Sequence, residues 1–227
     1  MRYEIHHAPV FSTLHIILDA QEQIKAEAGA MVAMSPSVEL QAKTTGKGFF
    51  GAIGAALGGE NIFASLFTAQ EDGSELILAP SYPGDILVVE LEGNGLFAQG
   101  GAWLASSPDI EIQTKGSMKA LFSGEGLFLQ HLRGRGPVFL SSYGAIIKKT
   151  LRAGESYKVD SGHIVAFEET VQYKIRTASR GLMSSVFSGE GLVCEYYGPG
   201  TIWIQSRNLP SLAKVLEPYL PKPSGNS

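Results

Sequence analysis

Cysteine is nearly missing from this chain, which has one, Cys194, among 227 residues. A single cysteine excludes a disulfide within the chain, so a reducing compartment, the cytoplasm, is the expected location. Cys194 lies in a predicted strand. Because free cysteine is usually buried, we expect a small hydrophobic core residue there and not a reactive thiol.

Long hydrophobic runs are also missing. The first seven residues lack the apolar core of a signal peptide. The longest apolar run, residues 49–59, is far shorter than the ~20 residues that span a bilayer. We therefore expect a soluble protein.

Charge is scarce and slightly acidic. Charged residues make up 18% of the chain, the net charge is −4 and the pI is near 5.8. Nucleic-acid-binding domains usually carry a basic face, so we expect no nucleic-acid partner. The local basic pairs Lys148–Lys149 and Arg133–Arg135 are interpreted as solvated strands and turns.

Catalytic signatures are not found. The five histidines show no H-x-H or H-x-x-x-H spacing, no G-x-S-x-G occurs, and the glycines of residues 46–51 lack the order of a phosphate-binding loop. The sequence predicts no catalytic residue, no cofactor and no catalytic metal, and hence a protein that is not an enzyme.

What the chain does contain is a repeated glycine-glutamate motif. It occurs at Phe122–Phe128, again at Phe187–Val193, and in weaker form at Leu57–Phe63. Its glutamates, Glu60, Glu125 and Glu190, follow at intervals of 65 residues, and a glycine stands nine residues before each one. Such regular self-similarity is typical of a duplicated structural unit.

Strand patterns recur around this motif. Each unit has an apolar first strand, a glycine turn into a second, a third that alternates apolar and polar residues, and a closing strand. The alternation predicts one dry and one wet face for the third strand, at residues 38–43, 110–115 and 171–176. The units are 12–83, 84–143 and 144–207.

One unit of ~60 residues buries too little surface to be stable alone. We therefore predict one compact all-β domain over residues 1–207, with three copies in approximate internal threefold symmetry. A short helix begins near Asn208 or Ser211, and the segment 208–227 ends in a tail.

Two sets of residues are candidates for function. The apolar segment before the first motif, with Phe49, Phe50, Ile53 and Leu57, either contacts a partner or membrane or plugs the end of a sandwich. The three motif glutamates either accept backbone N–H bonds in tight turns, which duplication would copy, or gather around an axis to bind a cation.

These motifs, together with Asp160–Glu169 and Gly198–Gln205, resemble the altered-inheritance-of-mitochondria family of β-proteins. The resemblance implies a fold similar to the tryptophan RNA-binding attenuation protein, with double-stranded β-helix modules triplicated in one chain. Eukaryotic relatives are associated with mitochondrial inner-membrane organisation, and prokaryotic relatives have no settled activity. Fold likeness does not carry function.

The resulting hypothesis is a non-enzymatic binding or scaffolding protein that forms a homo-oligomer and touches a membrane or membrane-protein surface through its apolar loops. The alternative is a small-molecule or ion-binding protein that uses clefts between the repeats.

Overall fold

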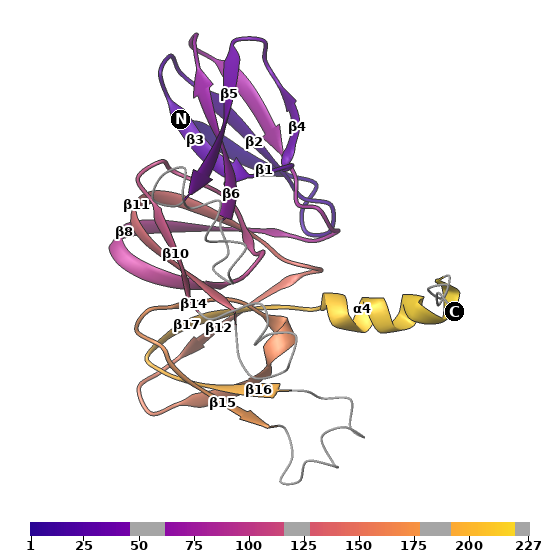
Figure 1. Ribbon diagram of the computed structural model, residues 1–227. Helices are drawn as coiled ribbons and strands as arrows, with labels where there is room; N and C mark the ends of the chain where they lie inside the picture. The colour runs from indigo at the N-terminus through magenta and orange to yellow at the C-terminus, as the bar shows by residue number, and fades with distance from the viewer. Residues whose placement is uncertain (46–61, 116–127, 178–191, 221–227) are drawn as a thin grey trace.

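β-Strands dominate the computed structural model, which describes residues 1–45, 62–115, 128–177 and 192–220. In these ranges the chain forms strands β1 to β17 and the helix α4, arranged as a column of three groups of strands (Figure 1). The all-β fold class is confirmed.

The first group is a sandwich of two sheets. One sheet has the order β1 (Arg2–His6), β2 (Thr13–Leu18), β7 (Ser74–Leu78) and β4 (Met31–Met34). The facing strands are β3 (Gln23–Glu27), β6 (Ile62–Ala69) and β5 (Val38–Thr45). Alternate side chains of β2 and β3 point between the two layers, where they form one buried cluster with Phe67.

The second group is built on two long antiparallel strands. β8 (Ile86–Gln99) and β11 (Leu129–Ser141) pair along their whole lengths, with an irregularity between Arg133 and Arg135. β9 (Trp103–Ser106) pairs with the second half of β11, and β10 (Glu111–Lys115) pairs with its first half. A second buried cluster includes Trp103 and Leu132.

The third group again has two sheets. β12 (Ile146–Leu151), β17 (Gly200–Gln205) and β14 (Ile164–Glu168) form one sheet in that order. β13 (Ser156–Asp160), β16 (Leu192–Tyr197) and β15 (Gln172–Thr177) form the other. Cys194, in β16, lies in the buried cluster between them, so its predicted burial is confirmed.

The groups are joined by strand pairing. β3 pairs with β9, with Lys25 opposite Ser106 and Ala26 opposite Ala105. β8 pairs with β14, with Phe97 opposite Phe167 and Ala98 opposite Ala166. One continuous sheet therefore runs from the first group to the third.

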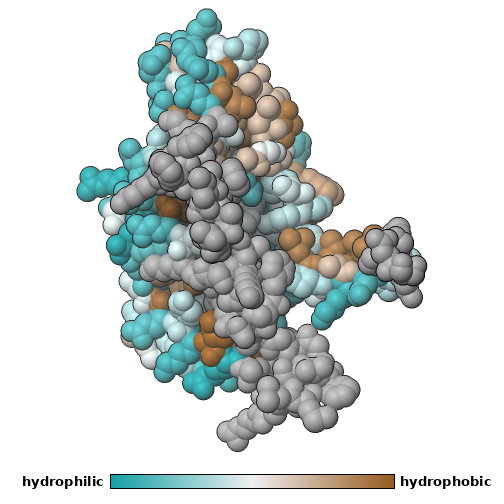
Figure 2. All heavy atoms as spheres, viewed as in Figure 1, coloured by the Kyte–Doolittle hydropathy of each residue, from teal (hydrophilic) through white to brown (hydrophobic). Residues whose placement is uncertain are grey.

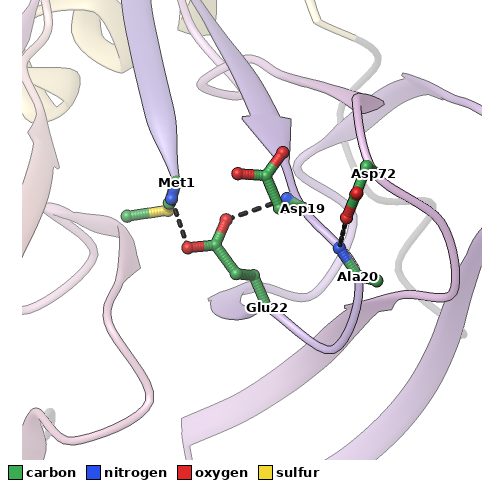
Figure 3. Close-up of polar contacts among 5 residues, drawn as sticks. All are labelled: Met1, Asp19, Ala20, Glu22 and Asp72. Atoms are coloured by element: carbon green, nitrogen blue, oxygen red, sulfur yellow. Dashed lines mark hydrogen bonds and ion pairs between the residues drawn. The ribbon is translucent and has the colours of Figure 1, made fainter.

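The two ends of the chain are held in different ways. The Met1 ammonium pairs with the Glu22 carboxylate, which also accepts from the Asp19 amide at 2.9 Å (Figure 3). In the adjoining turn, Asp72 accepts from the Ala20 amide at 2.8 Å. The Met1–Glu22 pair ties β1 to the start of β3, and the Ala20–Asp72 bond joins the turn before β3 to the turn between β6 and β7.

At the other end, α4 (Leu209–Leu216) projects sideways from the strands and continues into the turn η3 (Glu217–Tyr219) (Figure 1). The Asn208 side chain caps α4 by accepting from the Ser211 amide at 2.8 Å, so Asn208 and not Ser211 is the cap among the two that the sequence predicts.

Two expectations need correction. The dry face predicted for the third strands is only partly dry, because Leu40 of β5 is 43% exposed and Tyr173 and Ile175 of β15 are each 38% exposed. β5 and β15 each end a sheet. Sequence analysis also missed the strands β1, β3, β6 and β13 and the inner halves of β8 and β11.

Candidate functional site

Strand β4 has an apolar sequence but no buried side chain. Met31 is 39% exposed, Val32 is 59% exposed and Met34 is 37% exposed. β4 pairs with β7, and no other described strand pairs with its second edge. An exposed apolar edge is a template for a further strand.

The strands β9 and β14 occupy the same position as β4 in their own groups. Each of the three strands pairs with the closing strand of its group, and the register of each pairing shifts once. Met34 of β4, Ser106 of β9 and Phe167 of β14 are at corresponding positions in these pairings, opposite β7, β11 and β17. Yet every residue of β9 and the first four of β14 are buried. This difference in burial comes from the edge that does not face β7, β11 or β17. In β9 this edge pairs with β3, and in β14 it pairs with β8.

At the opposite end of the column, strand β13 also lacks a described partner on one edge. β13 occupies the place of β3 and of the inner half of β8, but in the described part of the chain it pairs only with β16. Tyr157 of β13 is 43% exposed, although Ile24 and Leu96, at the corresponding positions, are 0% and 1% exposed. In the described part of the chain, β4 and β13 therefore each lack the partner that β9 and β3 find in one another.

At the two junctions between groups, β3 with β9 and β8 with β14, side-chain contacts add to the strand pairing. In the first, the Lys25 ammonium donates to the Ile110 carbonyl of the next group. Burial lowers the pKa of Lys25, and the charges of Asp109 and Glu111 oppose that shift. Lys158 of β13 stands at the position of Lys25.

The second junction is aromatic and ionic. The Phe97 ring stacks on Phe167 with centroids 5.2 Å apart and on His131 at 4.4 Å. Glu169 lies 3.2 Å from His131 Nε2 and pairs with Arg133. Although burial acts to raise the pKa of Glu169, the hydrogen bond from Arg133 and the electrostatic interactions with Arg133 and His131 lower it.

The candidate functional residues from the sequence are not among those that the structure describes. Phe49, Phe50, Ile53, Leu57, Glu60, Glu125 and Glu190 all lie outside the described residues. Sequence analysis missed both exposed edges. The apolar residues of β4 are typical of a buried strand, and whether a strand edge is exposed depends on a neighbouring strand that the local sequence does not identify.

Other chemistry was searched for in the described ranges. No group of three histidine, cysteine or acidic side chains is placed to hold a metal ion there. None of the helices in these ranges is long and apolar enough to cross a bilayer. Burial raises the pKa of the Cys194 thiol to about 11, which keeps it protonated near neutral pH.

Comparison with known proteins supports this fold. The model of the mitochondrial biogenesis AIM24 family matches residues 3–207. An uncharacterised protein of Streptococcus pyogenes serotype M6 is 35% identical over 233 residues, which cover 99% of this chain and 93% of the relative. The X-ray crystal structure of a Streptococcus pyogenes protein has a TM-score of 0.81 and 32% identity, with 96% of this chain and 99% of that chain covered. The chain belongs to the mitochondrial biogenesis AIM24 family.

Proposed function

We propose that this protein is a non-enzymatic scaffold that assembles head to tail, with β13 of one copy paired to β4 of the next. The observation that carries the proposal is the exposure of β4 beside the burial of β9 and β14, its counterparts in the other two groups.

The proposal treats the three groups as copies of one TRAP-like module, related by an approximate internal threefold operation. It is supported by their shared pairing order and by the register of the two internal junctions. Continued by one step, that register sets Lys158 opposite Met34 and Val159 opposite Ala33 of the next copy. Lys158 would then reach the carbonyl of Val38, as Lys25 reaches that of Ile110.

Such a junction joins unlike surfaces, so each addition leaves a free β4 and a free β13. Interfaces of this kind close into rings or grow into filaments, according to the rotation between copies. The function of the assembly is therefore structural: it presents many copies of one chain in a fixed relative orientation.

Side-chain burial supplies part of the driving force. Fully burying a large apolar side chain contributes roughly 1.5–3 kcal/mol. Val32 and Met34 are 59% and 37% exposed, so each has about 1 kcal/mol left to gain. Losing both should weaken association about 30-fold, since 1.4 kcal/mol corresponds to a factor of ten.

The test is sedimentation velocity and native mass spectrometry of the wild type and of the variant Val32→Lys/Met34→Lys. The wild type should associate, and the variant should associate at least about 30-fold more weakly with an unchanged circular dichroism spectrum. Ile175→Lys is the matched control, because Ile175 is 38% exposed but lies on β15, which β16 separates from β13. Equal association of both variants would refute the proposal.

The proposed contact of the apolar loop with a membrane is a separate matter. Wild-type protein should float with liposomes, and Phe49→Ser/Phe50→Ser should stay at the bottom of the gradient. If the wild type does not float, membrane contact is removed while the scaffold proposal stands.

A further inference from the structure

Helix α4 has no buried residue, and its larger apolar side chains are exposed along the helix (Figure 2). They are Leu209, Leu212, Val215 and Leu216. The helix projects sideways from the column of strands (Figure 1) and meets it at its first turn, where Asn208 contacts His163. The Nδ2 atom of Asn208 lies 2.6 Å from Nε2 of the His163 ring. This contact therefore joins the start of α4 to the column.

The His163 ring is presented to α4 by a frame of hydrogen bonds. The ring belongs to the turn η2 (Ser161–His163), which follows β13 directly. The Gln205 side chain donates to the Gly162 carbonyl at 3.0 Å and accepts from the Tyr143 amide at 2.9 Å. Because Gln205 ends β17 and Tyr143 precedes β12, two other segments of the third group hold η2 in place.

The hydrogen bonds around Asn208 determine which atoms carry protons. The Asn208 Oδ1 atom accepts from the Ser211 amide at 2.8 Å, because a backbone amide can only donate. The Nδ2 group of Asn208 therefore faces His163 and donates to Nε2, which carries no proton. On the other side of the ring, Nδ1 lies 2.8 Å from the Gln205 carbonyl, which can only accept. The ring is therefore neutral, with its proton on Nδ1.

The cap at Asn208 depends on a single donor. An N-cap side chain accepts from the amide of the second or the third helical residue. In α4 the second residue is Pro210, which has no N–H, so the Ser211 amide is the donor. A helix of eight residues is marginal without tertiary contacts. Loss of this one bond therefore weakens the helix at its start.

A proton on Nε2 of His163 breaks this arrangement. The new N–H points at the Asn208 NH2 group, so two donors face each other across a contact of 2.6 Å. Turning the Asn208 amide over gives its oxygen to the ring but sets the NH2 group against the Ser211 N–H. Either the contact with the column or the cap of α4 is therefore lost.

In the described part of the chain, the charged groups around the His163 ring are engaged elsewhere or oppose a proton. Asp160, at the end of β13, accepts from a backbone amide of η2 at 2.8 Å. In β16, which packs against η2, Glu195 pairs with Arg176 at 3.0 Å. Arg207 and the ring both line an open hollow of about 380 Å³ beside α4, where the charge of Arg207 opposes a second positive charge. The other side chains that line this hollow include no carboxylate: Tyr143, Ser206, Asn208, Ser211, Leu212 and Val215.

We propose that His163 is a pH switch for α4: the neutral ring holds the helix in one orientation, and protonation of the ring releases it. The docked helix excludes a proton from Nε2, so the released form binds more protons. Docking is therefore strongest near pH 8 and weakens as the pH falls toward 5, across the range in which histidine ordinarily changes its charge. Acidification thus frees the apolar side of α4 from its fixed place beside the column. This inference does not depend on the head-to-tail assembly.

The experiment is hydrogen exchange of the full-length protein, measured by mass spectrometry between pH 8 and pH 5, with labelling times corrected for the intrinsic effect of pH. In a peptide that covers residues 209–220, protection should fall about 2- to 30-fold on acidification, the factor that corresponds to the loss of an N-cap. Protection of β17 should stay the same. Equal protection of α4 at both pH values would contradict the proposal.

Two substitutions identify the residues responsible. Asn208→Asp should reverse the sign of the pH dependence, because one carboxylate oxygen keeps the bond from the Ser211 amide while the other accepts from the protonated ring. His163→Gln should remove the pH dependence, because glutamine does not titrate. The proposal is wrong if Asn208→Asp loses protection on acidification as the wild type does, or if His163→Gln keeps the pH dependence.

His15→Gln is the matched control. It makes the same replacement on β2 in the first group, where the His15 Nε2 atom lies 3.1 Å from the Thr13 hydroxyl. This variant should keep the wild-type pH dependence of α4, and loss of that dependence would contradict the proposal. Far-ultraviolet circular dichroism should be the same at pH 8 and pH 5 in all four proteins, since release of α4 leaves the strands paired.

Discussion

Phe167 is the residue whose loss best tests whether the three groups of strands unfold as one. Its ring is fully buried and contacts Phe97, Tyr173 and Tyr196 at centroid distances of 5.2, 5.3 and 5.2 Å. Phe97 belongs to the second group and the other two to the third. The substitution Phe167→Ala therefore removes packing on both sides of a junction.

The expected cost follows from burial. A buried Phe→Ala change typically costs about 3–5 kcal/mol, the sum of lost transfer free energy and the cavity that remains. For a chain of this size 1 kcal/mol corresponds to roughly 2–4 °C, so the melting temperature should fall by about 6–20 °C. Phe167→Leu, which keeps most of the volume, should cost less than about 1.5 kcal/mol.

The assay is urea unfolding followed by tryptophan fluorescence and far-ultraviolet circular dichroism. Both probes should show one coincident transition, shifted to lower urea with an unchanged slope. Phe67→Ala, buried in the first group at 1% exposure, should shift the same single transition. Two separate transitions, with each variant moving only one, would refute unfolding of the three groups as one unit.

Three further predictions concern single sites. The Cys194 thiol should resist alkylation at pH 8 in the folded protein and react on unfolding, because its pKa is raised to about 11; full labelling of native protein would contradict this. Gly84→Ala should cost more than about 3 kcal/mol in urea unfolding, since its Cβ would overlap the backbone of Ser142, whereas Gly73→Ala has open space and should cost about 1 kcal/mol for its positive φ. The pKa of Glu169 in the folded protein is lowered from 4.5. Its ion pairs therefore stabilise the fold above pH 4.5, and this stabilisation is lost as the pH falls through the folded-state pKa. Glu169→Gln should therefore lose stability at pH 7 and change little near pH 2, and an equal loss at both values would contradict the ionic account.

Local sequence determined the elements whose signals are local. Period-two alternation marked the third strands. Asn208 and Ser211 marked two possible starts of α4, and the structure has Asn208, whose side chain reaches the amide three residues later. The burial of Cys194 also followed from residue type alone. In each case the signal lies in the residue itself or in the few residues around it.

Strands without clear alternation were harder to find. The inner halves of β8 and β11 contain glycine and charged residues, and they are strands because they pair with each other across more than thirty residues of chain. That partner is set by the fold and not by their own composition.

The exposed edges were decided by tertiary structure alone. Met31-Val32 in β4 and Trp103-Leu104 in β9 are both apolar pairs, yet β4 is exposed and β9 is buried. The burial of a strand's outer edge depends on whether another strand lies beside it. That neighbour is β3 for β9, and the described residues contain none for the free edge of β4.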